Sequence, residues 1–208
     1  VRQFVDRYQT GYRRAVVERW LTRSGRYLDM IREIFAQRGL PEELIFTAMI
    51  ESGFDPVAAS RAGARGLWQF MAPTARLYGL RVDRWTDERL DPEKSTRAAA
   101  AYLKDLFTTY GSWTLAQAAY NGGAVRINRA IQNLKTTDFW QLTRGRHLAE
   151  ETKNFVAAIQ AVVVIGREPE RYGFSITPEP AVRYETIRVP AGTKLPRIAV
   201  FTGTAPTE

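Results

Sequence analysis

The chain has 208 residues, of which 45% are hydrophobic and 12% aromatic, with no cysteine and one histidine, His147. This composition fits one folded domain. It excludes disulfides, cysteine-ligated zinc and multi-histidine metal sites. A Ser-His-Asp triad would have to use His147. The net charge of +8 suits an anionic partner such as nucleic acid, a membrane surface or an acidic polymer. The arginines are scattered among acidic residues, however, which favours a solvated basic surface over nucleic-acid binding.

The first forty residues have a helical pattern. Apolar residues recur every four positions and predict one apolar stripe, which we interpret as core and not as a binding platform: Phe4, Tyr8, Tyr12, Val16 and Trp20. Ser24 and Gly25 interrupt this stripe. A second stripe follows from Tyr27 to Phe35 and ends at Gly39, so residues 1–38 are predicted to be helical.

A third helix is predicted to begin at Pro41, because proline and the two glutamates after it suit the first turn. It runs through apolar residues to Glu51 and ends near Ser52 and Gly53. Residues 54–67 read as a loop rich in small residues. Pro73 opens a short helix that ends at Gly79.

Asp91 and Pro92 predict a strong helix start, and apolar spacing continues to Gly111. Further helices are predicted over 113–120, 124–134 and 148–165. No apolar stretch approaches the ~20 residues of a membrane-spanning helix. Composition changes near Pro169, and the alternation over 183–189 predicts a strand, followed by a linker-like end. The prediction is a mainly all-α domain over 1–172, with a core over 40–172, and a C-terminal extension over 173–208.

Glu51 is the principal candidate for chemistry. It shares a helix face with Ala48, Thr47 and Leu44 on a mostly apolar helix, so its carboxyl group should lose hydration and its pKa should rise. The C-terminal end of the helix dipole acts in the same direction. A carboxylic acid that stays protonated near neutral pH is suited to general-acid cleavage of a glycosidic bond. The alternatives are a solvent-facing glutamate and a buried ion pair.

Three motifs in order carry a resemblance to a known family. The first is Glu51-Ser52-Gly53-Phe54-Asp55-Pro56, continued by Ala59-Ser60 and by residues 63–75, GARGLWQFMAPTA. The second is residues 118–123, AAYNGG, and the third is residues 150–156, EETKNFV. Together they resemble the lytic transglycosylases of the Slt type, over roughly residues 40–174. Any one of these motifs alone would be a weak signal.

The resemblance implies a goose-lysozyme-like helical domain with a substrate cleft, in which Glu51 is the catalytic acid and Ser52 lies behind it. It further implies substrate-binding or neighbouring roles at the positions that match the family pattern: Ser60, Gln69, Met71, Tyr120, Asn121 and Glu151. From the residues alone, Gly66 is better explained as a backbone turn than as a ligand contact. Asn121 could equally be a cap, and Tyr120 could be core. Trp68, Ala149 and Phe155 depart from the family's usual residues, which affects subsite detail.

The reaction that the resemblance implies needs no metal and no organic cofactor. Glu51 would protonate the oxygen between N-acetylmuramic acid and N-acetylglucosamine in peptidoglycan glycan strands, and the muramoyl 6-hydroxyl would close a 1,6-anhydro ring. The alternatives are a goose-type lysozyme, which needs a second carboxylate, and a non-catalytic peptidoglycan-binding module. Asp55 precedes Pro56 and is expected to leave the cleft, so Glu151 is the candidate for that second carboxylate. The resemblance also implies a location in the periplasm, with an outer-membrane lipid anchor or LysM modules outside these residues. The sequence does not fix the oligomeric state, for which a monomer is the expectation.

Overall fold

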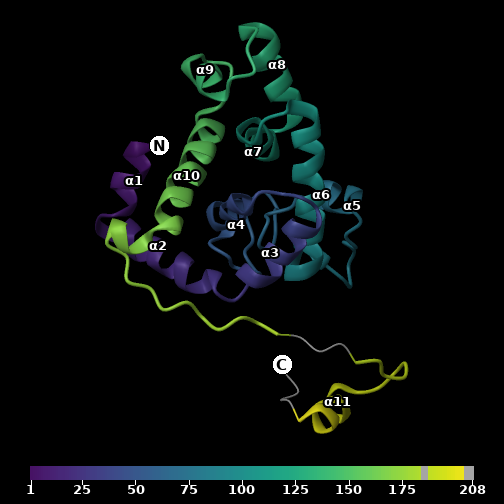
Figure 1. The fold of residues 1–208 in the computed structure, drawn as a ribbon. Coiled ribbons are helices and arrows are strands. Elements are labelled where there is room, and N and C mark those ends of the chain that lie inside the picture. The colour runs from purple at the N-terminus through teal and green to yellow at the C-terminus, as the bar shows by residue number, and fades with distance from the viewer. Residues whose placement is uncertain (184–186, 204–208) are drawn as a thin grey trace.

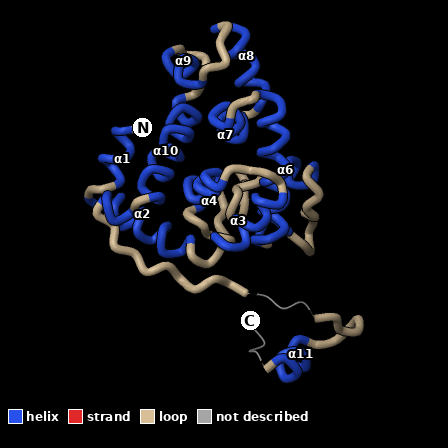
Figure 2. Tube along the Cα trace, viewed as in Figure 1, coloured by secondary structure: helices blue, strands red, loops and turns tan. Residues whose placement is uncertain are grey.

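In the computed structural model the chain forms a body of packed helices, from which an extended tail leads to one further helix (Figure 1). The structure describes residues 1–183 and 187–203, and within them it has no strand beyond three isolated bridges (Figure 2). The predicted all-α fold is therefore confirmed. The α-helices are α1 (Arg2–Tyr8), α2 (Gly11–Ser24), α3 (Leu28–Gln37), α4 (Ile45–Ser52), α5 (Ala72–Leu77), α6 (Pro92–Tyr110), α7 (Trp113–Gly122), α8 (Ala124–Leu134), α9 (Phe139–Arg144), α10 (Glu150–Arg167) and α11 (Leu195–Thr202), and the 3-10 helices are η1 (Glu42–Leu44), η2 (Glu88–Leu90) and η3 (Pro169–Tyr172).

The long helices α6 and α10 stand on either side of α7, and α4 lies below α7 near the centre of the body (Figure 1). Two clusters of buried apolar side chains fill this body. Ile50, Tyr102 and Tyr120 pack against both clusters. The C-terminal ends of α4 and α7 and the middle of α6 therefore meet at the junction between the two cores.

Local sequence signals explain where the central helices begin and end. The Asp91 side chain accepts a hydrogen bond from the Lys94 amide at 2.9 Å, and Pro92 occupies the first turn of α6, as the sequence predicts. The six-residue helix α9 was not predicted. Its start is capped by the Asp138 side chain, which accepts from the Trp140 amide at 2.8 Å.

The predicted apolar stripe of the first forty residues is interrupted. Thr10 has an extended backbone (φ −127°, ψ 149°), so the segment divides into α1 and α2. Tyr8 is buried, but Tyr12 is 80% exposed. The interpretation of all these aromatic residues as core was therefore wrong for Tyr12, because the break turns the stripe into the lining of an open groove.

The residues after η3 first follow the helical body and then leave it. Phe174 is buried, and the amides of Glu179 and Val182 donate to the carbonyl oxygens of Thr22 at 2.9 Å and Arg26 at 3.0 Å. In the predicted strand over 183–189, residues 184–186 lie outside the described residues, and Arg183 and residues 187–189 have no strand conformation. The predicted linker-like end contains α11, which was not predicted.

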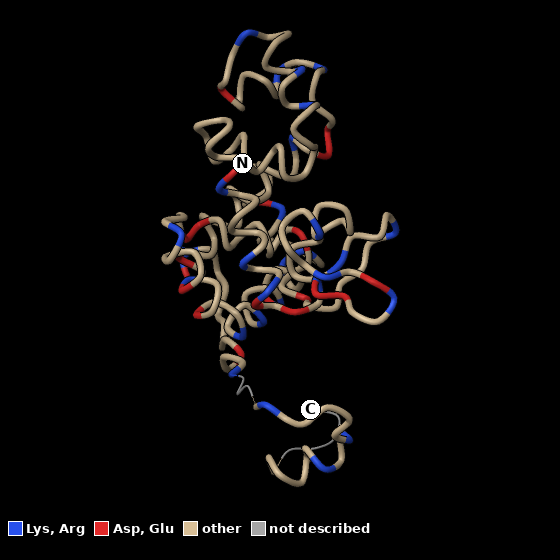
Figure 3. The backbone as a smooth tube through the Cα atoms, turned by 90° about the vertical axis from the view of Figure 1, so that its right-hand side faces the viewer, with Lys and Arg blue, Asp and Glu red and all other residues tan. Residues whose placement is uncertain are grey.

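Charged residues are interspersed over the helical body, with basic and acidic positions close to one another (Figure 3). Within the described residues, no helix combines the length and apolar character needed to cross a membrane.

Candidate active site

Glu51 lies in the last turn of α4, and three features fix that turn. Thr47, Ala48 and Met49 are buried, which anchors the helix in the core. Gly53 has φ +60° and ends the helix directly after Ser52. The Ser52 hydroxyl donates to the Leu67 carbonyl oxygen at 2.8 Å, so the end of α4 is joined to the loop that precedes α5. Glu51 is thus held on a rigid element.

The carboxyl group of Glu51 is protonated at neutral pH. Burial and, to a smaller extent, the negative charge of Glu151 together raise its pKa to about 8. Glu51 is half-buried and makes no ion pair among the described residues. The solvent-facing and ion-paired alternatives therefore do not describe this side chain. A group in this state can donate a proton to an oxygen that comes within hydrogen-bond distance.

Tyr120, on α7, belongs to the same site. Its hydroxyl donates to the Trp68 carbonyl oxygen at 2.7 Å, and its ring lies 5.0 Å from that of Tyr102. Burial raises the pKa of Tyr120 well above its ordinary value, and the nearby Glu51 and Tyr102 act in the same direction. Tyr120 therefore stays a neutral, oriented hydroxyl whose oxygen can still accept a hydrogen bond.

Two further carboxylates were candidates for a second catalytic group. Glu151 is exposed in the first turn of α10, where the helix dipole favours negative charge, and its charge acts on Glu51. Asp55 forms an ion pair with Arg23 at 3.7 Å and accepts from the Val57 amide at 3.1 Å. Asp55 is therefore engaged in the loop after α4. Within residues 1–183 and 187–203, no group of three or more acidic or histidine side chains is arranged to hold a metal ion.

Ser60, Gly66 and Gln69 shape the loop between α4 and α5. The exposed Ser60 accepts from the Ala64 amide at 3.0 Å through its hydroxyl oxygen. The Gln69 side-chain amide donates to the carbonyl oxygens of Gly66 at 2.9 Å and Ala58 at 3.2 Å. Gly66 has φ +80°, which is the backbone requirement expected from the sequence. The structure gives all three residues contacts within this loop, and none of those contacts is to Glu51.

The two other predicted residues have different surroundings. Met71 is 43% exposed, directly before α5. The Asn121 side-chain oxygen accepts from the Thr152 hydroxyl at 2.9 Å. Asn121 therefore joins the end of α7 to the first turn of α10, which carries Glu151.

Sequence reasoning missed two residues that build the site. Tyr102 falls within the helix predicted from Asp91 to Gly111, and no spacing signal indicates that its ring packs against that of Tyr120. Arg89 is 5% exposed, forms an ion pair with Asp87 at 2.7 Å, and donates to the carbonyl oxygens of Gly63 at 2.8 Å and Phe70 at 3.0 Å. Arg89 thus holds the loop that supplies the Trp68 carbonyl group to Tyr120. In the sequence, the segment Asp87-Glu88-Arg89 fits the family pattern, but this resemblance does not indicate a role for Arg89 in the site.

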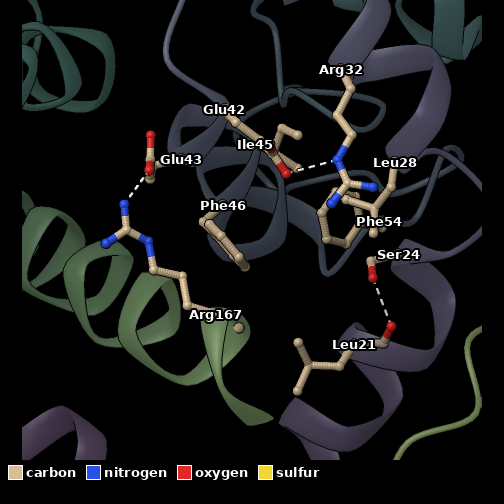
Figure 4. Close-up of a pocket in the computed structure, with 11 residues that line it drawn as sticks. Leu21, Ser24, Leu28, Arg32, Glu42, Glu43, Ile45, Phe46, Phe54 and Arg167 are labelled. Atoms are coloured by element: carbon tan, nitrogen blue, oxygen red, sulfur yellow. Dashed lines mark hydrogen bonds and ion pairs between the residues drawn. The ribbon is translucent and has the colours of Figure 1, made fainter.

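A cavity of about 330 Å³ lies on another side of α4 (Figure 4). Phe46 and Phe54 line it, and two ion pairs stand beside it, Arg32 with Glu42 at 2.7 Å and Arg167 with Glu43. Its charged groups are already paired, and none of the predicted site residues lines it. It is therefore separate from the site at Glu51.

Two solved structures of lytic transglycosylases have a similar fold. The chain is 27% identical to Slt from Pseudomonas aeruginosa, with a TM-score of 0.56 over 75% of this chain and 25% of that one. That structure is an inactive mutant in which glutamine replaces a glutamate. The 70 kDa soluble lytic transglycosylase Slt70 from Escherichia coli shares the fold with a TM-score of 0.59 and 22% identity, over 69% of this chain and 24% of that one.

Two sequence relatives are also named as lytic transglycosylases. Over 152 residues the chain is 39% identical to membrane-bound lytic murein transglycosylase D from Escherichia coli strain K12, covering 71% of this chain and 33% of that protein. It is 32% identical over 159 residues to membrane-bound lytic murein transglycosylase C from Edwardsiella ictaluri, covering 64% of this chain and 44% of that protein. The chain thus spans about a third of the first of these relatives. The family model described as Transglycosylase SLT domain matches residues 29–143, more than half of the chain, so this chain belongs to the transglycosylase SLT domain family.

Proposed function

We propose that this chain is the catalytic part of a peptidoglycan lytic transglycosylase. The observation that carries the proposal is the neutral carboxylic acid of Glu51, whose pKa is raised to about 8, held beside the oriented hydroxyl of Tyr120. The names of the relatives, which act on murein, supply the substrate class. An inactive mutant of the Pseudomonas aeruginosa relative, in which glutamine replaces a glutamate, supports a reaction that depends on a glutamate.

In the proposed reaction Glu51 works first as acid and then as base. It donates its proton to the oxygen between N-acetylmuramic acid and N-acetylglucosamine, and the bond from that oxygen to the muramoyl anomeric carbon breaks. The substrate's own acetamido group stabilises the positive carbon. The muramoyl 6-hydroxyl oxygen then bonds to this carbon, and its proton returns to Glu51. No water is consumed, and the tethered nucleophile supplies much of the rate advantage.

The other predicted residues have supporting roles in this proposal. Tyr120 orients groups beside the acid, Ser52 and Gly66 support the backbone around it, and Ser60, Gln69, Met71, Asn121 and Glu151 border the bound glycan. Residues 1–172 form the catalytic unit and residues 173–208 an extension. Peptidoglycan lies in the periplasm, so the proposal puts the domain there, and we expect it to act as a monomer. The relatives' names indicate attachment to a membrane.

The products of digestion test this function. Purified sacculi digested with the chain are expected to release muropeptides that end in 1,6-anhydro-muramic acid, which mass spectrometry distinguishes from reducing ends by the mass of one water. A second candidate, hydrolysis as in lysozyme, is kept open by Glu151, whose charge acts on Glu51. Reducing ends without anhydro products would establish the hydrolase and overturn the proposal.

The pH dependence follows from the protonation of Glu51. Since only the protonated acid starts the reaction, the initial rate should fall as pH rises through about 8, by about tenfold per further pH unit. Glu151→Gln removes a negative charge that raises the pKa of Glu51, so this decline should move to lower pH. The measurement is the release of soluble fragments from about pH 5 to pH 10, with circular dichroism at each pH to show that the protein stays folded. A decline centred near the ordinary glutamate pKa would contradict the assignment.

A further inference from the structure

A groove of about 360 Å³ lies between α1 and α2, outside the site at Glu51. Four aromatic side chains line it, namely Phe4, Tyr8, Tyr12 and Trp20, together with Arg7 and Arg13. Tyr8 and Trp20 meet edge to face, with ring centroids 6.3 Å apart. The interrupted stripe of the N-terminal segment thus forms a hollow lined by aromatic rings with two cations.

One cation of this groove already faces an aromatic ring, because Arg7 lies over Phe4 at 5.9 Å from the ring centroid. Among the described residues, Arg7 and Arg13 form no ion pair, and the Tyr8 hydroxyl makes no hydrogen bond. The neighbouring Arg14 differs, since it pairs with Glu18 at 3.1 Å and donates to the Gly173 carbonyl oxygen. Tyr12 is 80% exposed, which leaves a large apolar ring in water. An anionic ligand with apolar faces would satisfy both the cations and the rings.

The N-terminal segment that contains the groove is positively charged, like the two arginines that line the groove. Residues 1–38 contain nine arginines and four acidic residues, which accounts for five of the eight net positive charges of the chain. A glycan strand of peptidoglycan carries carboxylates on its stem peptides and presents apolar faces on its sugar rings. The groove is therefore complementary to that polymer in both charge and surface character.

The groove leads towards the catalytic helix. Trp20 lines the groove and also packs against Gly53, where a β-carbon would be only 2.2 Å from the indole ring. Arg23 donates to the Gly53 carbonyl oxygen at 3.2 Å. Gly53 follows Glu51 by two residues, so the lining of the groove touches the chain segment that ends the catalytic helix.

We propose that this groove is a second binding site for peptidoglycan, which holds a carboxylate-bearing stretch of glycan strand beyond the stretch that occupies the site at Glu51. Aromatic rings pack against the sugar faces, and Arg7 and Arg13 bind the carboxylates. This inference rests on the proposed function for the identity of the polymer. The groove raises the affinity for long strands and leaves the chemical step unchanged.

Binding is measured in the Glu51→Gln background, in which the polymer should stay intact. Tyr12→Ser with Arg13→Ser removes one exposed ring and one unpaired cation from the groove. Leu77→Ser with Arg19→Ser is the matched control, since Leu77 is 79% exposed, Arg19 is exposed without an ion pair, and neither lines the groove. Retention on purified sacculi should weaken about tenfold for the groove variant and change little for the control. Equal losses in the two variants would mean unspecific charge attraction and would overturn the proposal.

A kinetic comparison separates this proposal from the proposed function. With Glu51 intact, the groove variant should show a higher KM on long glycan strands with unchanged kcat, and unchanged kinetics on fragments too short to reach the groove. If no anhydro products form at all, the proposed function fails, while the sacculus-binding comparison still reports on the groove. If products form and the groove variant binds sacculi like the control, only the groove proposal fails. Loss of binding to anionic phospholipid vesicles with unchanged sacculus binding would likewise overturn it.

Discussion

Glu51→Gln is expected to slow glycan cleavage by about a thousandfold, because general acid–base catalysis contributes rates of this order and glutamine has no acidic proton. Glutamine has nearly the same size and can occupy the same position, so binding to sacculi should persist. Clearing of a sacculus suspension measures the rate, and co-sedimentation measures the binding. Unchanged clearing would show that Glu51 is not the acid, and absence of clearing by the parent chain would favour a non-catalytic binding module.

The same substitution is expected to stabilise the fold at neutral pH. The pKa of Glu51 is raised to about 8 in the folded protein from 4.5, so between these values the unfolded chain loses a proton that the folded chain keeps. This difference destabilises the fold progressively from about pH 4.5 to pH 8, by about 1 to 3 kcal/mol at pH 7 after allowance for partial exposure. Glutamine removes that cost. Thermal unfolding should therefore give a higher Tm for Glu51→Gln near pH 7 and almost none of that gain near pH 4.

Glu170→Gln is the matched control for this stability measurement. Glu170 is exposed, and its side chain makes no hydrogen bond or ion pair among the described residues. Its replacement should leave both the Tm and the clearing rate unchanged. A gain in Tm that is the same for both variants, or that does not depend on pH, would contradict the burial of an uncharged acid at position 51.

Gly66→Ala is expected to cost about 3 to 4 kcal/mol of the free energy of unfolding. Gly66 has φ +80°, and a β-carbon there would lie 1.8 Å from the carbonyl oxygen of Arg89. Because the clashing atom belongs to the backbone, the clash can be removed only by a shift of the loop or of the segment around Arg89. Alanine also loses stability because it has to adopt a left-handed conformation. Urea unfolding followed by circular dichroism measures this loss.

Gly63→Ala provides the control within the same loop. Gly63 has φ +90°, but a β-carbon there would have no atom within 4 Å. Only the conformational strain remains, so the expected loss is about 1 to 2 kcal/mol. Equal losses at the two positions would show that the close approach of Gly66 to Arg89 does not constrain the fold.

The fold was largely predictable because helix periodicity and end signals are local. Asp91 and Pro92 mark the start of α6, and the apolar run before Glu51 marks α4. The division of the N-terminal stripe was not predictable, because the residues around Thr10 keep helical spacing while the backbone becomes extended. The short helix α9 offered too few residues for a periodic signal.

The properties of the site likewise fall into those that local sequence predicts and those that depend on contacts between distant segments. Burial of Glu51 on an apolar helix, and the direction of its pKa shift, followed from residues within two turns of the helix. Contacts between distant segments did not follow from spacing. The packing of the Tyr102 ring against Tyr120 depends on how α6 and α7 pack. The hydrogen bonds from Arg89 to the carbonyl groups of the loop depend on the position of η2. The roles of Ser60, Gln69 and Met71 stay predictions.

The hydrogen bond between Tyr120 and residue 68 determines how a substitution at residue 68 affects the site. Tyr120 bonds to the main-chain oxygen of Trp68, whereas the indole nitrogen donates to the Thr96 hydroxyl at 2.9 Å within the core. Exchange of the indole for another large apolar group would alter packing near Phe35 and leave the acceptor of Tyr120 in place. The geometry beside the acid thus depends on the path of the backbone, whereas the side chain at this position is constrained by the packing of the core.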